Sequence, residues 1–488
     1  MGFRGSRVQI SPLRHYQFQI TKYNMSQKNT YNRNLIDLEY AVRGPLAKRA
    51  AELAQQGRDI IPCNLGNPQA IGQKPITFYR QVLSLMEYPD SIATERSRGD
   101  FISKDVLDYA EEFLSCGKGL GAYTDSKGPF FIREAIARFI DERDDVTNSG
   151  GVTSDPESIF LTDGASAGAR NIIELLIANS NDGIMIPIPQ YPLYSATIKR
   201  CSGVQVNYFP DEDNDWALNR DILDESITEA RKNGVNVKAI VVINPGNPTG
   251  AILDGESIND VIKFAEENDL AIIADEVYQD NLYGAEFISF TKSVGEKNIT
   301  LFSLHSASKG FHGECGHRGG YLEVRNPPKI TGSDAHLIDI LVKQASVSLC
   351  SNTVGQALIY MVVNPPQKGD DSYALFEKEK STVLNNQFKK ATMIKEAFKE
   401  MDSVECFGRI GALYLFPRLN KLPDGKNDFD YCMALLEKTG LSTVNGGGFG
   451  QKKGTQHMRI AFIPPTTMLQ NVLPRWIEFH NQFINPNA

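Results

Sequence analysis

Short apolar runs alternate with amphipathic segments through the middle of the chain, and this pattern predicts its fold. The apolar runs have the length of strands and lie at residues 158–162, 183–188, 204–209, 239–244 and 270–274. The segments between them have helical spacing and lie at residues 165–178, 194–201, 222–233 and 258–268. This alternation predicts an α/β domain with a mostly parallel sheet covered by helices on both faces. Ligands are expected at the carboxyl ends of its strands.

The pattern changes on both sides of this block. Residues 330–363 are largely helical, residues 376–401 form a long charged helix, and residues 404–416 have the pattern of a hairpin. They predict a second, smaller α+β domain. We divide the chain into a basic extension, a segment that packs with the small domain, a large ligand-binding domain and the small domain itself, at residues 1–36, 37–99, 100–345 and 346–488.

Size, charge and cysteine usage narrow the possible classes of protein. With 488 residues, the chain is too long for one compact core, so two or more domains are expected. The net charge of −8 and the lack of a long basic stripe argue against nucleic acid as a partner. The longest apolar runs have strand length, which argues against a membrane segment. Seven scattered cysteines without a CxxC pair favour reduced thiols over a disulfide scaffold.

The N-terminus differs in composition from the rest of the chain. Lysines and arginines occur between Arg4 and Arg33, and the first acidic residue is Asp37. This composition is typical of a mitochondrial transit peptide, and the alternative is a disordered basic tail. Met25 is an alternative start that would remove most of the feature. We therefore expect the protein in the cytoplasm or in the mitochondrial matrix, with the basic segment favouring mitochondria.

A lysine between small residues is the first candidate for chemistry. Lys309 follows the apolar run 299–304, and Ser306, Ser308 and Arg318 lie near it in the sequence. A cation at the end of a buried strand is costly unless it has a partner or a chemical role. One such role is imine formation with a carbonyl, and serines with an arginine suit a phosphate on that carbonyl compound. These residues predict a pyridoxal phosphate (PLP) lysine, and the alternative is a solvated lysine in a loop.

Three further positions fall where the sheet predicts a pocket. Asn247 lies in a turn rich in proline and glycine after one strand, while Asp275 follows the next strand, with Tyr278 three residues on. A buried carboxylate needs a partner, and a protonated pyridine nitrogen is one. Ala165 and Ser166 open a helix whose free N–H groups suit a phosphate. The alternatives are a plain turn at Asn247, and helix capping at Asp275 and at the start of the other helix.

These signals occur together with long segments that resemble a known family. The segments are residues 64–70, 187–196, 274–281 and 308–321. They resemble the fold-type-I PLP aminotransferases of class I and II, the alanine aminotransferases in particular, and the resemblance runs from about residue 40 to about residue 465. The sequence departs from the family pattern at residues 350–354, at His317 and at Gln456, which puts fine substrate preference in doubt.

The resemblance implies the fold and the roles of residues around the cofactor ring. It implies a large PLP-binding domain with a mostly parallel seven-stranded sheet, plus a smaller α+β domain. Lys309 is expected to form the imine and to move the proton between the substrate and the cofactor. Asp275 is expected to pair with the ring nitrogen. Tyr278 and Asn247 are expected to hold the ring oxygen, and Tyr191 to stack on the ring.

The resemblance also implies a phosphate site, a substrate site and a homodimer. The phosphate is expected to be held by Ala165, Ser166, Ser306, Ser308 and Arg318, with Tyr123 reaching in from a partner subunit. Arg459 is expected to bind the substrate carboxylate, together with Asn247, and Gly66 to lie over the substrate. An arginine inside the apolar run 458–462 is hard to explain by structure alone, because a buried unpaired charge costs several kcal/mol.

The expected activity is a transaminase reaction. L-alanine would leave as pyruvate, and 2-oxoglutarate would become L-glutamate, by ping-pong transfer of the amino group. The alternatives are a glyoxylate-using aminotransferase, another PLP enzyme of the same fold, and a non-catalytic regulator, although the basic head is too short for a DNA-binding module. His312 and His317 lack a second ligand group at zinc-like spacing, so no metal is predicted. The glycines at 446–450 lack the spacing of a phosphate loop.

Overall fold

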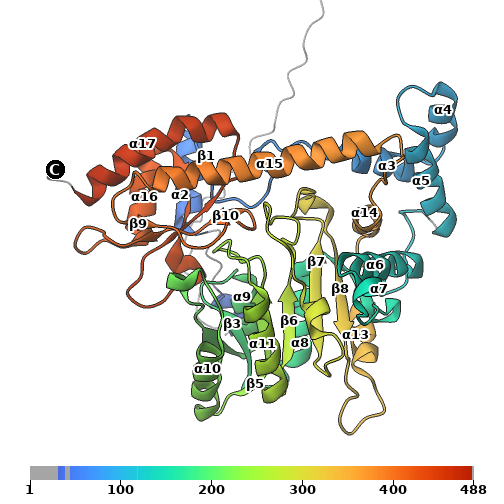
Figure 1. Cartoon of the computed structure of the whole chain (residues 1–488), viewed down its shortest axis with the longest axis horizontal. Coiled ribbons are helices and arrows are strands. Elements are labelled where there is room, and N and C mark those ends of the chain that lie inside the picture. The colour runs from blue at the N-terminus through green and yellow to red at the C-terminus, as the bar shows by residue number, and fades with distance from the viewer. Residues whose placement is uncertain (1–30, 39–43, 118, 486–488) are drawn as a thin grey trace, which may run out of the picture.

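A computed structural model describes residues 31–38, 44–117 and 119–485, so most of the basic extension lies outside the described residues. Its centre is a seven-stranded sheet (Figure 1). The strands, in their order across the sheet, are β2 (Ile159–Asp163), β8 (Gly319–Arg325), β7 (Leu301–Ser306), β6 (Ala271–Asp275), β5 (Asn236–Ile243), β3 (Asp182–Pro187) and β4 (Val204–Tyr208). Only β8 runs antiparallel to its neighbours, β2 and β7. The predicted mostly parallel sheet is confirmed.

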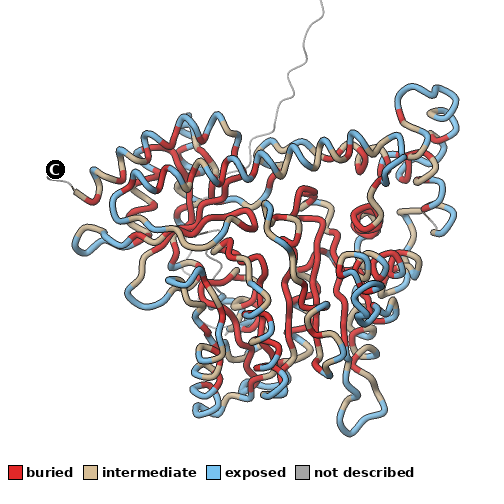
Figure 2. The backbone as a smooth tube through the Cα atoms, in the orientation of Figure 1, coloured by how far each residue is buried: buried red, intermediate tan, exposed pale blue. Residues whose placement is uncertain are grey.

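Helices cover both faces of this sheet, because its strands are apolar on both sides. Alternate residues of one strand face different cores: Val241 packs with one group of helices and Val242 with the other. The first group is α8 (Ala165–Leu176), α9 (Leu193–Arg200) and α13 (Leu337–Ser346). The second group is α10 (Arg220–Lys232), α11 (Gly255–Asn268) and α12 (Phe290–Val294). Figure 2 shows the resulting buried centre, and α10 and α11 with exposed outer surfaces.

A cluster of helices lies beside the sheet at its β2 edge, where it contacts β2 and β8. Its members are α3 (Thr77–Glu87), α4 (Ser91–Arg98), α5 (Lys104–Cys116), α6 (Phe130–Arg143), the short α7 (Val146–Ser149) and α14 (Thr353–Val363). Helix α14 is apolar nearly all round and is buried against β8, α6 and α3. Helical spacing at residues 76–86 and 129–141 predicts α3 and α6, and the structure has both. No helix is predicted where α4 and α5 lie.

The C-terminal part combines short strands with long helices. Helix α15 (Tyr373–Phe398) runs across the top of the molecule in Figure 1, and α16 (Asp428–Thr439) and α17 (Thr466–Ile484) pack with each other at its C-terminal end. The short strands are β9 (Val404–Glu405), β10 (Tyr414–Leu415), β11 (Arg418–Leu419), β12 (Leu441–Ser442), β13 (Val444–Asn445) and β14 (Met458–Ala461).

The predicted hairpin over residues 404–416 is wrong. Strand β9 pairs with β11, whereas β10 pairs with β14. Between them the chain crosses close to the loop after β5: a Cβ added to Gly411 would lie 2.5 Å from the carbonyl oxygen of Gly250. The backbone therefore follows that loop instead of folding back on itself.

The N-terminal segment contributes to the same region. Helix α1 (Arg33–Ile36) is followed by α2 (Pro45–Gln55), which contacts α16. The apolar pattern of residues 60–65, followed by a turn, predicts a strand, but the structure forms only the two-residue strand β1 (Ile61–Pro62), which pairs in parallel with β12. The boundaries of the four expected regions stay predictions.

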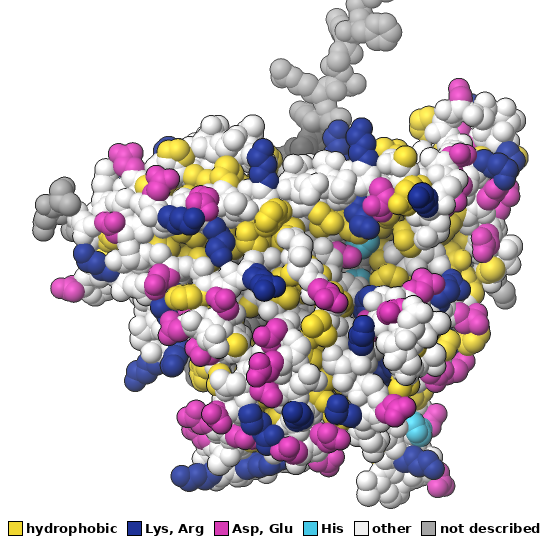
Figure 3. Space-filling model, viewed as in Figure 1, with side chains coloured by type: hydrophobic (Ala, Val, Ile, Leu, Met, Phe, Trp, Pro, Cys, Tyr) yellow, Lys and Arg dark blue, Asp and Glu magenta, His cyan; other side chains and the backbone are white. Residues whose placement is uncertain are grey.

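The surface is mixed in charge. Figure 3 shows acidic and basic side chains interspersed over the face in view, with apolar groups exposed between them. Within the described residues, no helix combines the length and apolar composition needed to cross a bilayer.

Candidate active site

A cavity of about 410 Å³ lies at the carboxyl ends of the central parallel strands. Ile243, Asp275 and Ser306, the last residues of β5, β6 and β7, line it, and the start of α8 forms another wall. Gly66 and Arg459 close it from the N-terminal segment and from β14. It lies where a parallel sheet places its ligands.

Lys309 follows β7 and reaches the N-terminal segment across this cavity. Its Nζ donates a hydrogen bond of 3.0 Å to the carbonyl oxygen of Gly66 and lies 5.8 Å from the centre of the Tyr278 ring. A Cβ on Gly66 would lie 2.1 Å from Oη of Tyr414 and 3.5 Å from Nζ of Lys309. Glycine is therefore required at position 66 for this close approach.

Asp275 is buried with one oxygen left open. Its Oδ2 accepts a hydrogen bond of 2.7 Å from Oη of Tyr194, whereas Oδ1 is buried without a hydrogen-bond partner among the described residues. Burial raises the pKa of the Asp275 carboxyl, although the hydroxyl of Tyr194, the backbone N–H of Val277 and the charge of Lys309 lower it. A buried acceptor without a partner is costly, so a donor bound in the cavity would stabilise this group.

Donors for an anion converge at the start of α8. Arg318 donates from Nη2 to the carbonyl oxygen of Asp163 at 2.9 Å and to Oγ of Ser166 at 3.1 Å. Ser306 and Ser308, which also line the cavity, lie with their hydroxyl oxygens 3.0 Å apart. With the free N–H groups of Ala165 and its neighbour at the helix start, the set suits a phosphate.

A second cation, Arg459, is buried at the opposite wall. Its Nη1 donates to Oδ1 of Asn247 at 3.1 Å and its Nη2 to the carbonyl oxygen of Asn64 at 2.9 Å. The guanidinium packs over the rings of Tyr414 and Phe449, 4.2 Å and 4.7 Å from their centres. It forms no ion pair with a carboxylate of the described residues, so it is free to bind one from a ligand.

Two tyrosine hydroxyls lie between these cations. Oη of Tyr278 is 3.4 Å from Oη of Tyr414 and 3.5 Å from Nδ2 of Asn247, both long for hydrogen bonds. Burial raises the pKa of Tyr278. Burial also opposes ionisation of Tyr414, but the charges of Lys309 and Arg459 outweigh it and lower the pKa of that phenol.

Comparison with known proteins identifies the family. The family model described as aminotransferase class I and II matches residues 96–475. The chain belongs to this aminotransferase family. Alanine aminotransferase 2 of Xenopus tropicalis is 41% identical, with 99% of this chain and 96% of that protein covered. Glutamate–glyoxylate aminotransferase 1 of Arabidopsis thaliana is 40% identical, with 93% and 96% covered. The solved alanine aminotransferase of Pyrococcus furiosus has a TM-score of 0.75 at 24% identity, covering 93% of this chain and 100% of that one.

Aminotransferases of this class use PLP, and the cavity fits that cofactor. Oδ1 of Asp275, which has no hydrogen-bond partner among the described residues, can accept a hydrogen bond from a protonated ring nitrogen. The donors around Arg318 can bind a phosphate. Lys309 lies in the same cavity with both groups. Tyr191 also lines it, and so do all other residues expected from the sequence except Tyr123, whose surface is 78% exposed.

Some residues around the site were not predicted from the sequence. Tyr194 lies in one of the segments that resemble the family, but nothing in its spacing indicated a bond to Asp275. Tyr414 lies in residues 404–416, whose pattern predicted only a hairpin. Asn67, Leu193, Val277 and Cys315 complete the lining.

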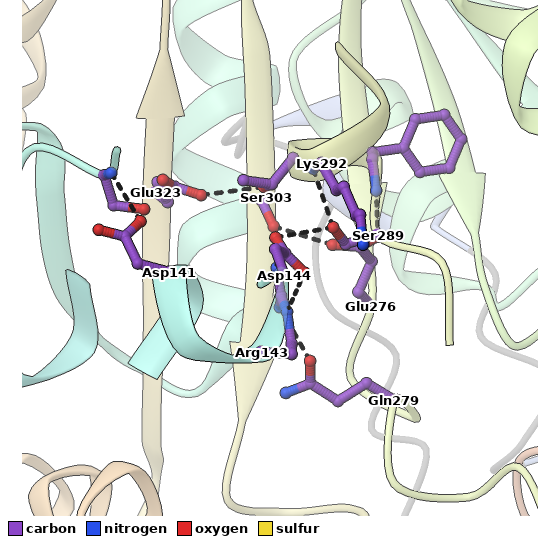
Figure 4. Close-up of polar contacts among 12 residues, drawn as sticks. Asp141, Arg143, Asp144, Glu276, Gln279, Ser289, Lys292, Ser303 and Glu323 are labelled. Atoms are coloured by element: carbon purple, nitrogen blue, oxygen red, sulfur yellow. Dashed lines mark hydrogen bonds and ion pairs between the residues drawn. The ribbon is translucent and has the colours of Figure 1, made fainter. Parts of the chain in front are cut away.

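Glu276 follows Asp275 directly but faces the other side of β6. Its Oε1 accepts from the backbone N–H of Phe290 at 2.8 Å, and its Oε2 accepts from Oγ of Ser303 at 3.0 Å. Figure 4 shows this carboxylate beside the ion pair of Arg143 and Asp144. Burial raises the pKa of Glu276 to about 7, against the charge of Arg143, which lowers it. No sequence signal pointed to this network.

Proposed function

We propose that this aminotransferase moves the amino group of L-alanine to 2-oxoglutarate, giving pyruvate and L-glutamate in a ping-pong cycle. The observation that carries the proposal is that Lys309, Asp275 and Arg459 line one cavity. Several relatives at 40–41% identity over nearly their whole length are named alanine aminotransferases, which supports the choice of donor.

In the proposed mechanism, the residues divide between binding and proton transfer. PLP, when bound, supplies a ring that accepts electrons from the substrate's Cα. Arg459 holds the substrate carboxylate with its two terminal nitrogens, and Asn247 orients that guanidinium. Lys309 holds the cofactor and carries the proton removed from Cα. Asp275, as a carboxylate, keeps a proton on the ring nitrogen.

The remaining residues hold the cofactor in place. Tyr278 and Asn247 bind the ring oxygen, and Tyr191 stacks on the ring face. Arg318 would hold the phosphate together with Ala165, Ser166, Ser306 and Ser308. Gly66 lies over the substrate and excludes water from it.

We also propose a homodimer in which Tyr123 of each subunit completes the partner's phosphate site. The exposure of its side chain supports this role, because a large aromatic group on the surface is suited to an interface. For the compartment, we propose the mitochondrial matrix or the cytoplasm. Two relatives, from Dictyostelium discoideum and Arabidopsis thaliana, are named as mitochondrial.

A second candidate is transfer from glutamate to glyoxylate, because two relatives at 40% identity carry that name. A panel of amino donors and 2-oxo acid acceptors on the purified holoenzyme separates the two candidates. We expect the highest kcat/KM for alanine with 2-oxoglutarate. A higher value for glyoxylate as acceptor would favour the second candidate.

Lys309→Ala is the matched control for this panel. It should abolish turnover with every donor, because the variant loses both the anchor and the proton carrier. Normal turnover in that variant would contradict the catalytic assignment.

A further inference from the structure

A second cavity, of about 510 Å³, lies apart from the candidate active site and shares no lining residue with it. It is bounded by α15, by residues 71–76 and by the turn after β14. Residues 71–76 follow the stretch that contains Gly66, and the turn follows β14, the strand that carries Arg459. Neither cofactor nor substrate, as placed above, uses this cavity.

The cavity contains a buried lysine without an acidic partner. Lys390 is 7% exposed and donates from Nζ to the carbonyl oxygen of Ile463 at 2.6 Å. It forms no ion pair with any described residue. Burial lowers the pKa of this amine to about 8, and the buried thiol of Cys63 opposes that change. An uncompensated buried cation destabilises the fold, so a bound anion would stabilise it.

The other charged groups of the lining also favour an anion. Lys74 and Lys378 face the cavity from residues 71–76 and from α15. Glu379 is the acid among the lining residues, and its oxygens already accept from the backbone N–H and the hydroxyl of Thr77 at 2.8 and 2.6 Å. The balance of charge is therefore positive.

An amide donor and an apolar wall complete the lining. Gln387 is 2% exposed; its Oε1 accepts from Tyr283 at 3.0 Å and from Asn281 at 3.1 Å, but its Nε2 is buried without a partner among the described residues. The apolar part of the lining consists of Ile71, Pro75, Ile76, Leu375, Val383 and Ile463.

We propose that this cavity binds a small monocarboxylate with a short apolar chain. Its carboxylate pairs with Lys390 and accepts from the amide of Gln387, and its chain packs against the apolar wall. Phosphate fits this cavity less well, because it would leave the apolar wall exposed to water.

Calorimetric titration of the holoenzyme with hexanoate tests the proposal. Binding should be lost in Lys390→Met, a substitution of similar length without charge, and kept in Lys389→Met, the adjacent exposed lysine on the same helix. Thr382→Trp, which fills the cavity from its exposed rim, should also remove binding. Unchanged aminotransferase activity in each variant will show that it folds. If hexanoate bound at Arg459 instead of in this cavity, binding would remain in all three variants and alanine would compete with it. That outcome would contradict the proposal.

The pH dependence gives an independent signature. At pH 8 about half of the Lys390 amines carry a proton, and a bound carboxylate raises that fraction. Titrations in two buffers with different ionisation enthalpies should therefore show proton uptake at pH 8 and none at pH 6. The affinity should fall about tenfold between pH 7 and pH 9, because the charged form becomes the minor one.

Probes of different chemistry identify the source of the ligand. Hexanoate binding without pyruvate binding indicates a carboxylate from outside the reaction, whereas pyruvate binding that also requires Lys390 indicates the reaction's own oxo acid. Equal binding of hexylammonium, or hexanoate binding that Lys390→Met leaves unchanged, would overturn the proposal.

Discussion

Asp275 and Glu276 are adjacent carboxylates at the end of β6, and their surroundings differ in one decisive way. Glu276 has a donor for each oxygen, and the ion pair of Arg143 and Asp144 lies beside it. Asp275 has a donor for one oxygen only. Both are buried, so the difference lies in the unused hydrogen-bonding capacity, which marks the side of the sheet where a ligand binds.

The arginines on the two sides repeat this difference. Arg143 donates to both oxygens of Asp144, at 2.8 and 2.7 Å. Arg459 binds an amide and a carbonyl oxygen and has no carboxylate among the described residues. A closed ion pair stabilises the native fold, whereas an open cation is available to a substrate.

The largest expected effect comes from isosteric amides at the two carboxylates. Asp275→Asn should lower kcat/KM by about 10³-fold, because the amide cannot hold a proton on the ring nitrogen by charge. Glu276→Gln should stay within about threefold, since the hydroxyl of Ser303 can turn to accept from the new amide. Steady-state kinetics of both holoenzymes measure the contrast. Equal losses would show that the two faces are not functionally distinct.

The next largest effect is on the free energy of unfolding, at the ion pair of Arg143 and Asp144 on the side of the sheet where Glu276 lies. Arg143→Met should lower the free energy of unfolding by about 3–5 kcal/mol, because it leaves Asp144 buried without its cation. The activity per folded molecule should change little. Denaturant unfolding measures the first quantity, and specific activity of the native fraction measures the second. A stable variant with lost activity would place Arg143 in the catalytic machinery instead.

The pH dependence of Glu276 sharpens the comparison further. Its pKa is raised in the folded protein from 4.5 to about 7, so the native state holds this proton more tightly than the unfolded state does. The free energy of unfolding should therefore fall as the pH rises from about 4.5 to about 7, by about 3 kcal/mol. The stability of Glu276→Gln relative to the wild type should rise over the same range. A difference independent of pH would contradict the raised pKa.

The smallest expected effect is at Tyr194, the donor that Asp275 does have. Tyr194→Phe should lower kcat/KM about tenfold, which is the value of one hydrogen bond to a charged group. Tyr208→Phe is a matched control, because Tyr208 is another buried tyrosine whose hydroxyl donates to the carbonyl oxygen of Val241 at 2.7 Å. Similar losses of activity in both variants would indicate a general packing effect.

The sequence predicted the residues that line the cavity at Asp275 better than the buried residues around Glu276 on the other side of the sheet. Lys309, Asp275 and Arg459 stand out because ionisable residues adjoin apolar runs, and the structure places all three in one cavity. Glu276 gave no such signal, since its partners come from α6, β7 and the start of α12. The hairpin at 404–416 failed because strand pairing there depends on β14, some fifty residues later in the chain. Helix α4 was missed because its stretch is polar, with Ile92 as its buried residue. Helix α5 was missed although Val106, Leu107, Ala110 and Phe113 form a buried face with helical spacing.

The contact between Gly250 and Gly411 has a consequence for redesign of this enzyme. A side chain on either glycine would meet the backbone of the other segment, at 3.0 Å and 2.5 Å from a carbonyl oxygen. Main chain touches main chain there, so no neighbouring rotamer can make room. Libraries that diversify the loops around the substrate should keep both glycines fixed and vary the positions whose side chains point into open space.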